Sequence, residues 1–263
     1  MVSLSAWFEN LLFADAAKDT EAVPGRKIVT VIGSGGKTSL IWHLAASLTG
    51  SGRRTLVTPT TKMFVPPPEA KLYDRYCNGC PPQSVPGITL AGLFNETNGK
   101  LETLQPEIPE SIIHDYDLVL IEGDGSRLLP LKAWAEDEPV VPSFTTLTIG
   151  VLPLWPLGKP VSENLILRVS LFLALTGAEA GETIKPKHIR ALITGRMAEA
   201  DEPALPGLFA KARGKKVLFF NQVEDDETLK QARKTAELLS PSFRKDLCGI
   251  IAGSVREDSL VEL

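Results

Sequence analysis

A glycine-rich turn followed by lysine and threonine is the segment of this sequence best suited to binding a charged ligand. It reads Gly33-Ser34-Gly35-Gly36-Lys37-Thr38-Ser39. Backbone N–H groups of such a turn can point at an anion, and a helix that begins there directs its positive end to the same place. The sequence therefore predicts a phosphate-binding loop, in which Lys37 contacts the outer phosphates and Thr38 or Ser39 offers a hydroxyl to Mg²⁺.

The residues on both sides of this turn have the patterns of a strand and a helix. An apolar run at 28–32 precedes the turn, and 40–48 reads as a helix. The spacing G-x-G-G-K-T is two residues shorter than the common G-x-x-x-x-G-K-[ST] and resembles the ATP loop of the Mur-type peptide ligases. A dinucleotide-binding G-x-G-x-x-G pattern fails because Thr38 stands at its last position. The alternative is an ordinary glycine turn with a surface lysine.

An apolar strand that ends in two acids is the second segment with chemical meaning. Residues 118–121 are all aliphatic, and Glu122 and Asp124 follow them. Side chains two apart on a strand point the same way, so we expect both carboxylates to face the phosphates, one at Mg²⁺ and one orienting a nucleophile. Lys37, Glu122 and Asp124 are thus the candidate catalytic residues, and Thr38, Glu122 and Asp124 the candidate metal ligands. The alternative is a strand end with an acidic turn.

Further hydroxyl and cationic side chains follow neighbouring strand ends. Thr60, Thr61 and Lys62 end one predicted strand, and Arg127 and Lys132 come after the two acids. We expect these side chains to contact phosphate or an anionic substrate. An ordinary strand-to-loop turn and surface cations are the alternatives.

A later strand end carries a possible base-binding pattern. The strand predicted at 216–220 is followed by Asn221, Gln222 and, at the fourth position, Glu224. This arrangement is similar to the guanine-binding N-K-x-D segment of GTPases, so we expect Asn221 and Glu224 to contact the nucleotide base. Gln222 and Glu224 depart from lysine and aspartate, which leaves ATP and GTP as alternatives. A polar turn is the other interpretation.

The elements that must position these side chains alternate between strand and helix. This alternation predicts an α/β fold with a mostly parallel sheet, helices on both faces and P-loop NTPase-like architecture. We expect a single domain over 1–263, an amphipathic helix near 7–13 and a loop or hairpin excursion around 62–105. Strands are predicted at 27–33, 54–60, 118–121, 146–152, 216–220 and 247–252, and helices at 37–49, 106–115, 162–175, 185–193, 203–212 and 227–239.

Composition and cysteine usage narrow the classes of protein further. A net charge of −4 over 263 residues, without basic clusters, argues against nucleic-acid binding. The apolar stretch 165–175 carries Arg168 and is too short to cross a bilayer, so we expect a cytoplasmic protein with no membrane partner. Cys77 and Cys80 form a C-x-x-C pair without the further ligands of a zinc site, which favours free thiols or an adventitious disulfide over metal or selenium handling.

Taken together, the motifs resemble one family. They are the segments 31–38, 58–63, 122–133, 138–142 and 221–224, which occur in this order. Within them, Glu-x-Asp-Gly-x-x-x-x-Pro-x-Lys-Ala followed by Glu-Pro-Val-x-Pro is the most distinctive part. The chain resembles the YqeC-like family, accessory proteins of selenium-dependent hydroxylases, from about residue 20 to 254.

The resemblance implies a cytoplasmic, nucleotide-using factor that assists maturation of selenium-dependent molybdenum hydroxylases. Those enzymes or their cofactor-loading proteins are the implied partners. Lys37, Thr38, Glu122 and Asp124 match motif positions, while Lys132 and the Glu138 block match with no assigned role. The sequence favours an Mg²⁺-dependent, NTPase-like accessory protein. A small-molecule kinase, a Mur-ligase-like ATP-dependent enzyme and a non-catalytic nucleotide switch are the alternatives.

Overall fold

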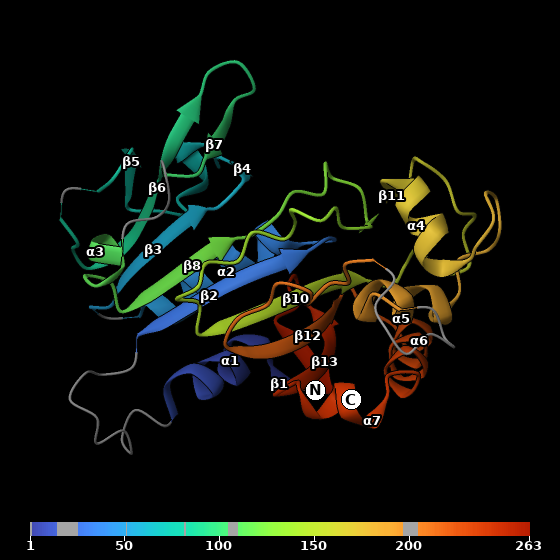
Figure 1. Cartoon of the computed structure of the whole chain (residues 1–263). Helices are drawn as coiled ribbons and strands as arrows, with labels where there is room; N and C mark the ends of the chain where they lie inside the picture. The colour runs from blue at the N-terminus through green and yellow to red at the C-terminus, as the bar shows by residue number, and fades with distance from the viewer. Residues whose placement is uncertain (1, 15–25, 51, 82, 105–109, 197–204) are drawn as a thin grey trace.

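A large sheet forms the centre of the protein (Figure 1). The computed structural model describes residues 2–14, 26–50, 52–81, 83–104, 110–196 and 205–263. Within these residues, a twelve-stranded sheet has the order β1-β14-β13-β12-β10-β2-β8-β3-β6-β7-β4, with β5 paired to β6. The strands are β1 (Val2–Ser3), β2 (Lys27–Gly33), β3 (Arg54–Pro59), β4 (Lys62–Phe64), β5 (Arg75–Asn78), β6 (Gly87–Asn95), β7 (Lys100–Glu102), β8 (Leu118–Glu122), β10 (Leu147–Pro153), β12 (Lys215–Asn221), β13 (Gly249–Ser254) and β14 (Ser259–Glu262).

The body of this sheet is parallel. All neighbouring pairs from β13 across to β6, and β5 with β6, run parallel. Antiparallel pairs occur only towards the two edges, where β14 and β1 lie on one side and β7 and β4 on the other. The central strands β2, β8 and β10 are buried along nearly their whole length, as parallel strands covered on both faces must be.

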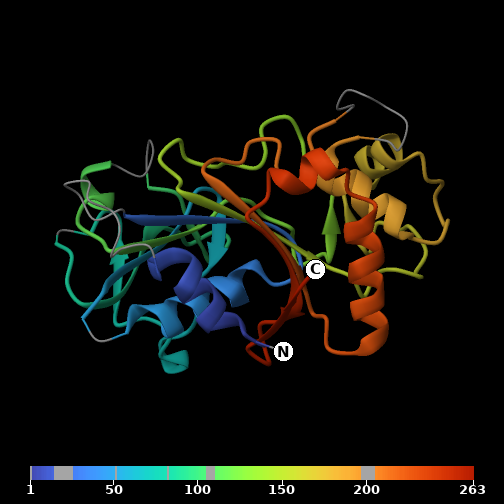
Figure 2. The same cartoon turned by 90° about the horizontal axis from the view of Figure 1, so that it is seen from below.

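Helices cover both faces of the sheet. Val29 and Val31 of β2 pack with α1 and α2, whereas Ile32 packs with α4, α5 and α6. Figure 2 shows the blue helices α1 and α2 on one side of the central strands and the yellow to orange helices on the other. The predicted α/β class, mostly parallel sheet and two-sided helical cover are therefore confirmed. The helices are α1 (Leu4–Phe13), α2 (Lys37–Thr49), α3 (Glu110–Ile113), α4 (Val169–Thr176), α5 (Pro186–Thr194), α6 (Asp226–Glu237) and α7 (Pro241–Lys245).

The amphipathic helix expected near the N-terminus is α1. Leu4, Phe8 and Leu12 form its buried stripe. The Asp258 carboxylate accepts hydrogen bonds from the Ser3 hydroxyl at 2.7 Å and from the Ser5 backbone N–H at 2.8 Å, so the start of α1 is attached to the turn before β14. In the described part of the chain, no helix is both long enough and apolar enough to cross a bilayer.

The excursion predicted around 62–105 is a hairpin with additional strands. β6 and β7 pair antiparallel, as predicted, and β4 extends them on the far side of β7. The stretch 63–86, which its many prolines make loop-like in sequence, instead contains most of β4, a 3₁₀ turn at Pro68–Ala70 and β5. Its backbone groups pair with β6 and β7, which satisfies donors and acceptors that a buried loop would leave unpaired.

Two predicted helices are not formed as expected. The helix predicted over 162–175 begins only at Val169, after a turn and the short strand β11 (Ile166–Leu167), which pairs with β9 (Leu131–Lys132). Arg168 takes a left-handed conformation between them, with φ of 60°. The described part of the helix predicted over 203–212 is a series of turns. There the backbone of Gly207 lies against that of Gly195. The helix predicted over 106–115 lies partly outside the described residues, and α3 is its described part.

Candidate functional site

The glycine turn follows β2, the strand at which the order in which the chain adds strands to the sheet reverses. After β2, the chain passes through α2 to β3 on the β8 side, while β10 flanks β2 on the other side. In open α/β sheets, such a reversal leaves a crevice outside the carboxyl ends of the strands, where ligands bind. The turn, Glu122 and Asn221 all follow or end strands at this edge.

Packing and backbone conformation require glycine in the turn. Gly33 has φ of 105° and Gly36 φ of 118°, which L side chains rarely adopt. A Cβ on Gly33 would lie 2.1 Å from the Val151 carbonyl oxygen, and one on Gly36 would lie 2.2 Å from the Asn221 amide nitrogen. Any side chain at either position would displace the neighbouring strand end or the Asn221 amide.

The start of α2 presents a lysine and backbone N–H donors that have no hydrogen-bond partner among the described residues. Gly36 caps the helix without a side-chain hydrogen bond, and the first N–H groups of any helix lack partners within it. The Lys37 ammonium donates to the Gly33 carbonyl oxygen at 2.7 Å and lies 3.4 Å from Asp124 Oδ1. Only 4% of Lys37 is exposed. This grouping of N–H donors, helix dipole and cation is suited to an anion.

Glu122 ends β8 directly beside the first turn of α2. The Thr38 hydroxyl donates to Glu122 Oε2 at 2.8 Å. Burial raises the pKa of this carboxyl, while the Lys37 charge and the Thr38 hydrogen bond act in the opposite direction. A hydroxyl and a carboxylate side by side are hard oxygen ligands of the kind that Mg²⁺ takes next to phosphates.

Asp124 lies two residues further on, in a different environment. Its side chain is fully buried, and it accepts hydrogen bonds from the Gly33 backbone N–H at 3.0 Å, Lys132 Nζ at 3.0 Å and Trp134 Nε1 at 2.9 Å. We expected Glu122 and Asp124 to face the same way because side chains two apart on a strand do so. β8 ends at Glu122, so this rule does not apply to Asp124.

Lys132 and Asp124 belong to a set of interior charges that we call the buried ion cluster, which comprises Asp124, Lys132, Glu138 and Arg168. Lys132 is fully buried and its Nζ lies 2.8 Å from Glu138 Oε2, which Arg168 also contacts at 2.8 Å. Burial favours the neutral carboxyl, but the Arg168 and Lys132 hydrogen bonds outweigh it and lower the pKa of Glu138. Each charge in the cluster has an opposite partner, as buried ions require.

A cavity of about 310 Å³ opens above the turn and the start of α2. Its lining includes residues 35–39 of the turn, Glu122, Lys62 and Arg127 among the predicted site residues, whereas Ser34 is buried with its hydroxyl donating to the Pro130 carbonyl oxygen. Phe64, Lys100, Ser126, Leu128, Leu129 and Gln222 also line it and were not predicted. Lys62 and Lys100 come from β4 and β7, so the hairpin forms one wall of the cavity. Nothing in the local pattern of Lys100 separates it from a surface lysine, and only the pairing of β7 with β4 and β6 brings it here.

Comparison with known proteins places the chain in one family. The YqeC protein family model matches residues 29–170, which is more than half of the chain. The Escherichia coli (strain K12) protein named "Uncharacterized protein YqeC" is 32% identical over 239 residues, covering 88% of each chain. The chain belongs to the YqeC family. No solved structure matches it, so P-loop NTPase-like architecture stays a prediction.

The region matched by the YqeC family model contains the turn, both acids, the hairpin and all four residues of the buried ion cluster. Thr60 lies beside Glu122, where its N–H donates to the Glu122 carbonyl oxygen at 3.0 Å, but it does not line the cavity. The Thr61 hydroxyl is buried without a hydrogen-bond partner in the described residues. Lys132 lies in the buried ion cluster rather than at the cavity surface.

Asn221 and Glu224 lie beyond the segment matched by the YqeC family model, and the structure gives both of them protein partners. Asn221 donates to the Gly35 carbonyl oxygen at 2.8 Å and accepts from the Val255 N–H at 3.2 Å. Glu224 lies 2.6 Å from the guanidinium of Arg256 and accepts from the Ser254 hydroxyl. Asn221 therefore holds the turn through the Gly35 carbonyl oxygen. The contacts of Asn221 and Glu224 with a nucleotide base stay predictions.

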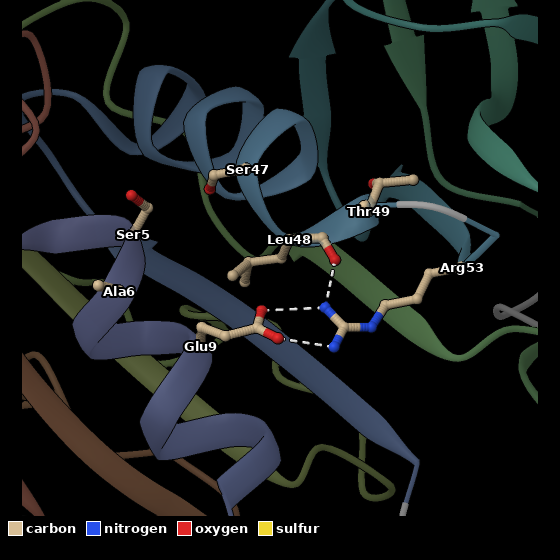
Figure 3. A pocket seen from close by; sticks show the side chains of 8 residues that line it. Ser5, Ala6, Glu9, Ser47, Leu48, Thr49 and Arg53 are labelled. Carbon is tan, nitrogen blue, oxygen red and sulfur yellow. Dashed lines mark hydrogen bonds and ion pairs between the residues drawn. The ribbon is translucent and has the colours of Figure 1, made fainter.

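A second pocket of about 460 Å³ lies between α1 and α2, away from the turn (Figure 3). Its charged groups are Glu9 and Arg53, which form two hydrogen bonds with each other at 2.9 and 2.6 Å, and Arg53 also donates to the Leu48 carbonyl oxygen. The charges of this pocket thus neutralise one another. We assign the functional site to the cavity above the turn because donors and a hydroxyl–carboxylate pair converge there.

The C-x-x-C pair of this YqeC-family chain lies on β5 and the turn after it. Cys77 is half-buried, Cys80 is exposed, and both are free. Burial raises the pKa of the Cys77 thiol. Across the described parts of the chain, no group of three or more His, Cys, Asp or Glu side chains gathers as a metal site.

Proposed function

We propose that this chain binds a nucleoside triphosphate with Mg²⁺ in the cavity above the glycine turn, as an NTPase-like accessory protein. One observation carries the proposal. The unpaired N–H groups at the start of α2, the Lys37 ammonium and the Thr38–Glu122 pair all line one cavity at the carboxyl edge of a parallel sheet. Each of these groups suits a different part of a metal-bound polyphosphate.

Each residue has a defined task in this proposal. The turn and the first N–H groups of α2 hold the phosphates, and Lys37 moves from the Gly33 carbonyl oxygen to the outer phosphate oxygens. Thr38 and Glu122 would hold Mg²⁺, directly or through water. When bound, the metal supplies charge neutralisation at the outer phosphates. Glu122 also remains the candidate for orienting a water or acceptor hydroxyl. Asp124, predicted as a metal ligand, is better placed to fix the Gly33 N–H and hence the shape of the turn.

The test is calorimetric titration of ATP and of GTP, with and without Mg²⁺, into the unmodified protein and Lys37→Ala. We expect affinity to fall by about a hundredfold or more, because a buried cation facing a polyphosphate is removed. Lys211→Ala, at an exposed lysine in the other half of the chain, is the matched control and should leave affinity unchanged. Retained affinity in Lys37→Ala, with circular dichroism showing a folded protein, would remove the proposal.

The titration also addresses the choice of base. The Asn221 amide is used on both sides by the protein, so it gives no support to a guanine-specific contact. Gln222 is the residue of that strand end that lines the cavity. The ratio of ATP to GTP affinity in the unmodified protein, and its change in Gln222→Ala, decides whether this end of the cavity recognises a base.

The biological role proposed is assistance to the maturation of selenium-dependent molybdenum hydroxylases in the cytoplasm. Membership of the YqeC family supports this through the resemblance described above. The test is hydroxylase activity in cells that lack this chain, complemented by the unmodified gene or by Lys37→Ala at equal protein level. Activity restored by the unmodified chain alone is expected. Full activity without the chain would contradict the proposed role.

A further inference from the structure

The cavity has a second charged wall that the phosphate loop does not use. Lys62 on β4 and Lys100 on β7 project into it from the hairpin, together with the ring of Phe64. We call these three residues the hairpin wall. Lys62 and Phe64 lie on the same face of β4, Lys100 lies on β7, and β4–β7 pairing places Phe64 directly opposite Lys100 in register. The Lys100 ammonium lies 4.5 Å from the centre of the Phe64 ring.

The charges of this wall are only partly compensated. Lys62 pairs with Glu102 at 2.9 Å, but 55% of its side chain is exposed. Within the described residues, Lys100 forms no ion pair with a carboxylate, and it lines the same cavity as Glu122. Lys100 is thus a cation on the cavity wall with an aromatic ring as its neighbour.

Apolar side chains complete the same part of the cavity. Arg127 and Leu128 both take the left-handed conformation, with φ of 51° and 65°. This unfavourable backbone holds Leu128 at the cavity mouth with 83% of its surface exposed. Strained backbone in non-glycine residues tends to persist where it serves a function. Phe64 and Leu128 offer contacts that a polyphosphate chain cannot use.

The direction of a bound nucleotide follows from the fold. A Mg²⁺ ion held by Thr38 and Glu122 would neutralise charge at the outer phosphates, so this pair would mark the terminal end of the triphosphate. Glu122 ends β8, and β3, β6 and the hairpin lie beyond it on that side, whereas Gln222 follows β12 on the opposite side of β2. The hairpin wall therefore lies past the terminal phosphate and away from the base.

We infer that the hairpin wall, with Arg127 and Leu128, binds a second small molecule beside the terminal phosphate. This molecule carries an anionic group, for Lys100, Lys62 and Arg127, and an apolar or ring portion, for Phe64 and Leu128. The inference rests on the proposed function, because it takes the terminal phosphate to lie over the turn. It gives that function a substrate class and favours a phosphotransferase or ligase over a simple NTPase.

Phenyl phosphate is a suitable probe because it combines an anion with a ring. It is titrated calorimetrically into protein saturated with Mg²⁺ and a non-hydrolysable ATP or GTP analogue. We expect one site per chain, weakened about tenfold or more by Lys100→Gln, which removes a charge-assisted contact. Leu128→Ala should weaken phenyl phosphate about three- to tenfold and leave inorganic phosphate unchanged. Lys211→Gln, the matched surface control, should change neither.

Nucleotide affinity measured in the same variants separates this inference from the proposed function. Lys100→Gln should change analogue affinity by less than about threefold. An effect as large as that of Lys37→Ala would overturn the inference, because Lys100 would then serve the triphosphate. Absence of phenyl phosphate binding to the loaded protein, or equal binding by Lys100→Gln, would also overturn it.

If the analogues fail to bind at all, the proposed function fails on its own. Phenyl phosphate titrated into the free protein then decides the hairpin wall separately. Binding that Lys100→Gln weakens supports an anion site there, and absence of binding refutes it.

Discussion

Glu122 and Asp124 leave the same strand end two residues apart, yet they enter two different environments. Glu122 lies at the cavity beside Thr38 with its pKa raised by burial. Asp124 belongs to the buried ion cluster, where two backbone or ring N–H groups and Lys132 satisfy it. The cavity holds groups that are incompletely paired and suited to a ligand. The cluster holds groups that are paired with one another.

This difference shows that the charged residues around the glycine turn have one of two roles, fixing the shape of the turn or facing a ligand. Those in the cluster fix the turn, since Asp124 holds the Gly33 N–H and Lys132 holds Asp124 in turn. Those in the cavity remain available. A charged side chain enclosed by protein partners contributes mainly to stability, and one that lines the cavity can contribute to binding even where, like Lys37, it also has protein partners. The following substitutions test this division, from the largest expected effect to the smallest.

Asp124→Ala should cause the largest loss of stability. It leaves the Gly33 N–H and the Trp134 Nε1–H buried without their partner and removes one of the two carboxylates that pair with the buried Lys132 ammonium, and such losses cost about 3–5 kcal/mol of the free energy of unfolding. Urea denaturation followed by circular dichroism measures the change. Glu122→Gln, an isosteric change that removes a charge from a poorly solvated site, should alter the same free energy by less than about 1 kcal/mol. Similar losses of unfolding free energy in Asp124→Ala and Glu122→Gln would contradict the assignment of Asp124 to stability and Glu122 to binding.

Glu122→Gln should instead reduce the magnesium-dependent part of nucleotide affinity. Loss of a carboxylate that holds a metal, directly or through water, typically weakens binding by about 10- to 100-fold. Affinity without Mg²⁺ should stay the same or rise, because a negative charge near the phosphates is removed. Calorimetry in the presence and absence of Mg²⁺ measures both. An unchanged magnesium effect would show that Glu122 is not at the metal.

The two regions should also respond to pH with opposite signs in the metal-free, nucleotide-free protein. The pKa of Glu138 is lowered in the fold, so its contribution is present above its ordinary value near 4.5 and is lost as pH falls through the folded pKa. The pKa of Glu122 is raised, so its contribution is present at low pH and is lost as pH rises through the folded pKa.

Denaturation curves across the acid range test these two signs. Glu138→Gln should remove part of the stability loss on acidification, and Glu122→Gln should remove part of the loss that accompanies deprotonation. If both variants flatten the same limb of the pH profile, the assignment of one carboxylate to the cluster and the other to the cavity is wrong.

The pocket between α1 and α2 should show the smallest effect. Glu9 and Arg53 are partly exposed, at 43% and 31% of their side chains, and exposed ion pairs contribute about 0.2–1 kcal/mol. Arg53→Ala should cost about that much free energy of unfolding and leave nucleotide affinity unchanged. A marked loss of nucleotide affinity in Arg53→Ala would move the binding site to this pocket.

The sequence was sufficient to predict the elements with strong periodicity. The turn between β2 and α2, the strand that ends at Glu122 and the hairpin of β6 and β7 were all predicted from local pattern. The division of labour between Glu122 and Asp124 could not be predicted, because it depends on β8 ending between them. The burial of Lys132 likewise depends on Glu138, which accepts its hydrogen bond, and on the Trp134 ring beside it, while Arg168 contacts Glu138.

The cavity wall made by the hairpin was also beyond local pattern. Lys100 follows an Asn-Gly turn and looks like any exposed lysine in sequence, and only strand pairing brings it towards Glu122. The helix predicted from 162 failed for a similar reason. The helical pattern of apolar residues includes Ile166, but Ile166 pairs with Leu131 of β9 in a short strand. Arg168, the next residue but one, contacts Glu138. Tertiary pairing overrode propensity in both places.

The most direct test is a structure of the protein crystallised with Mg²⁺ and a non-hydrolysable nucleoside triphosphate analogue. The account predicts phosphates over Gly35, Gly36 and the start of α2, with the metal between the Thr38 hydroxyl and Glu122. Asp124 should keep its hydrogen bond to the Gly33 N–H. A nucleotide seated in the pocket beside Arg53, or a metal on Asp124 with Glu122 turned away, would contradict it.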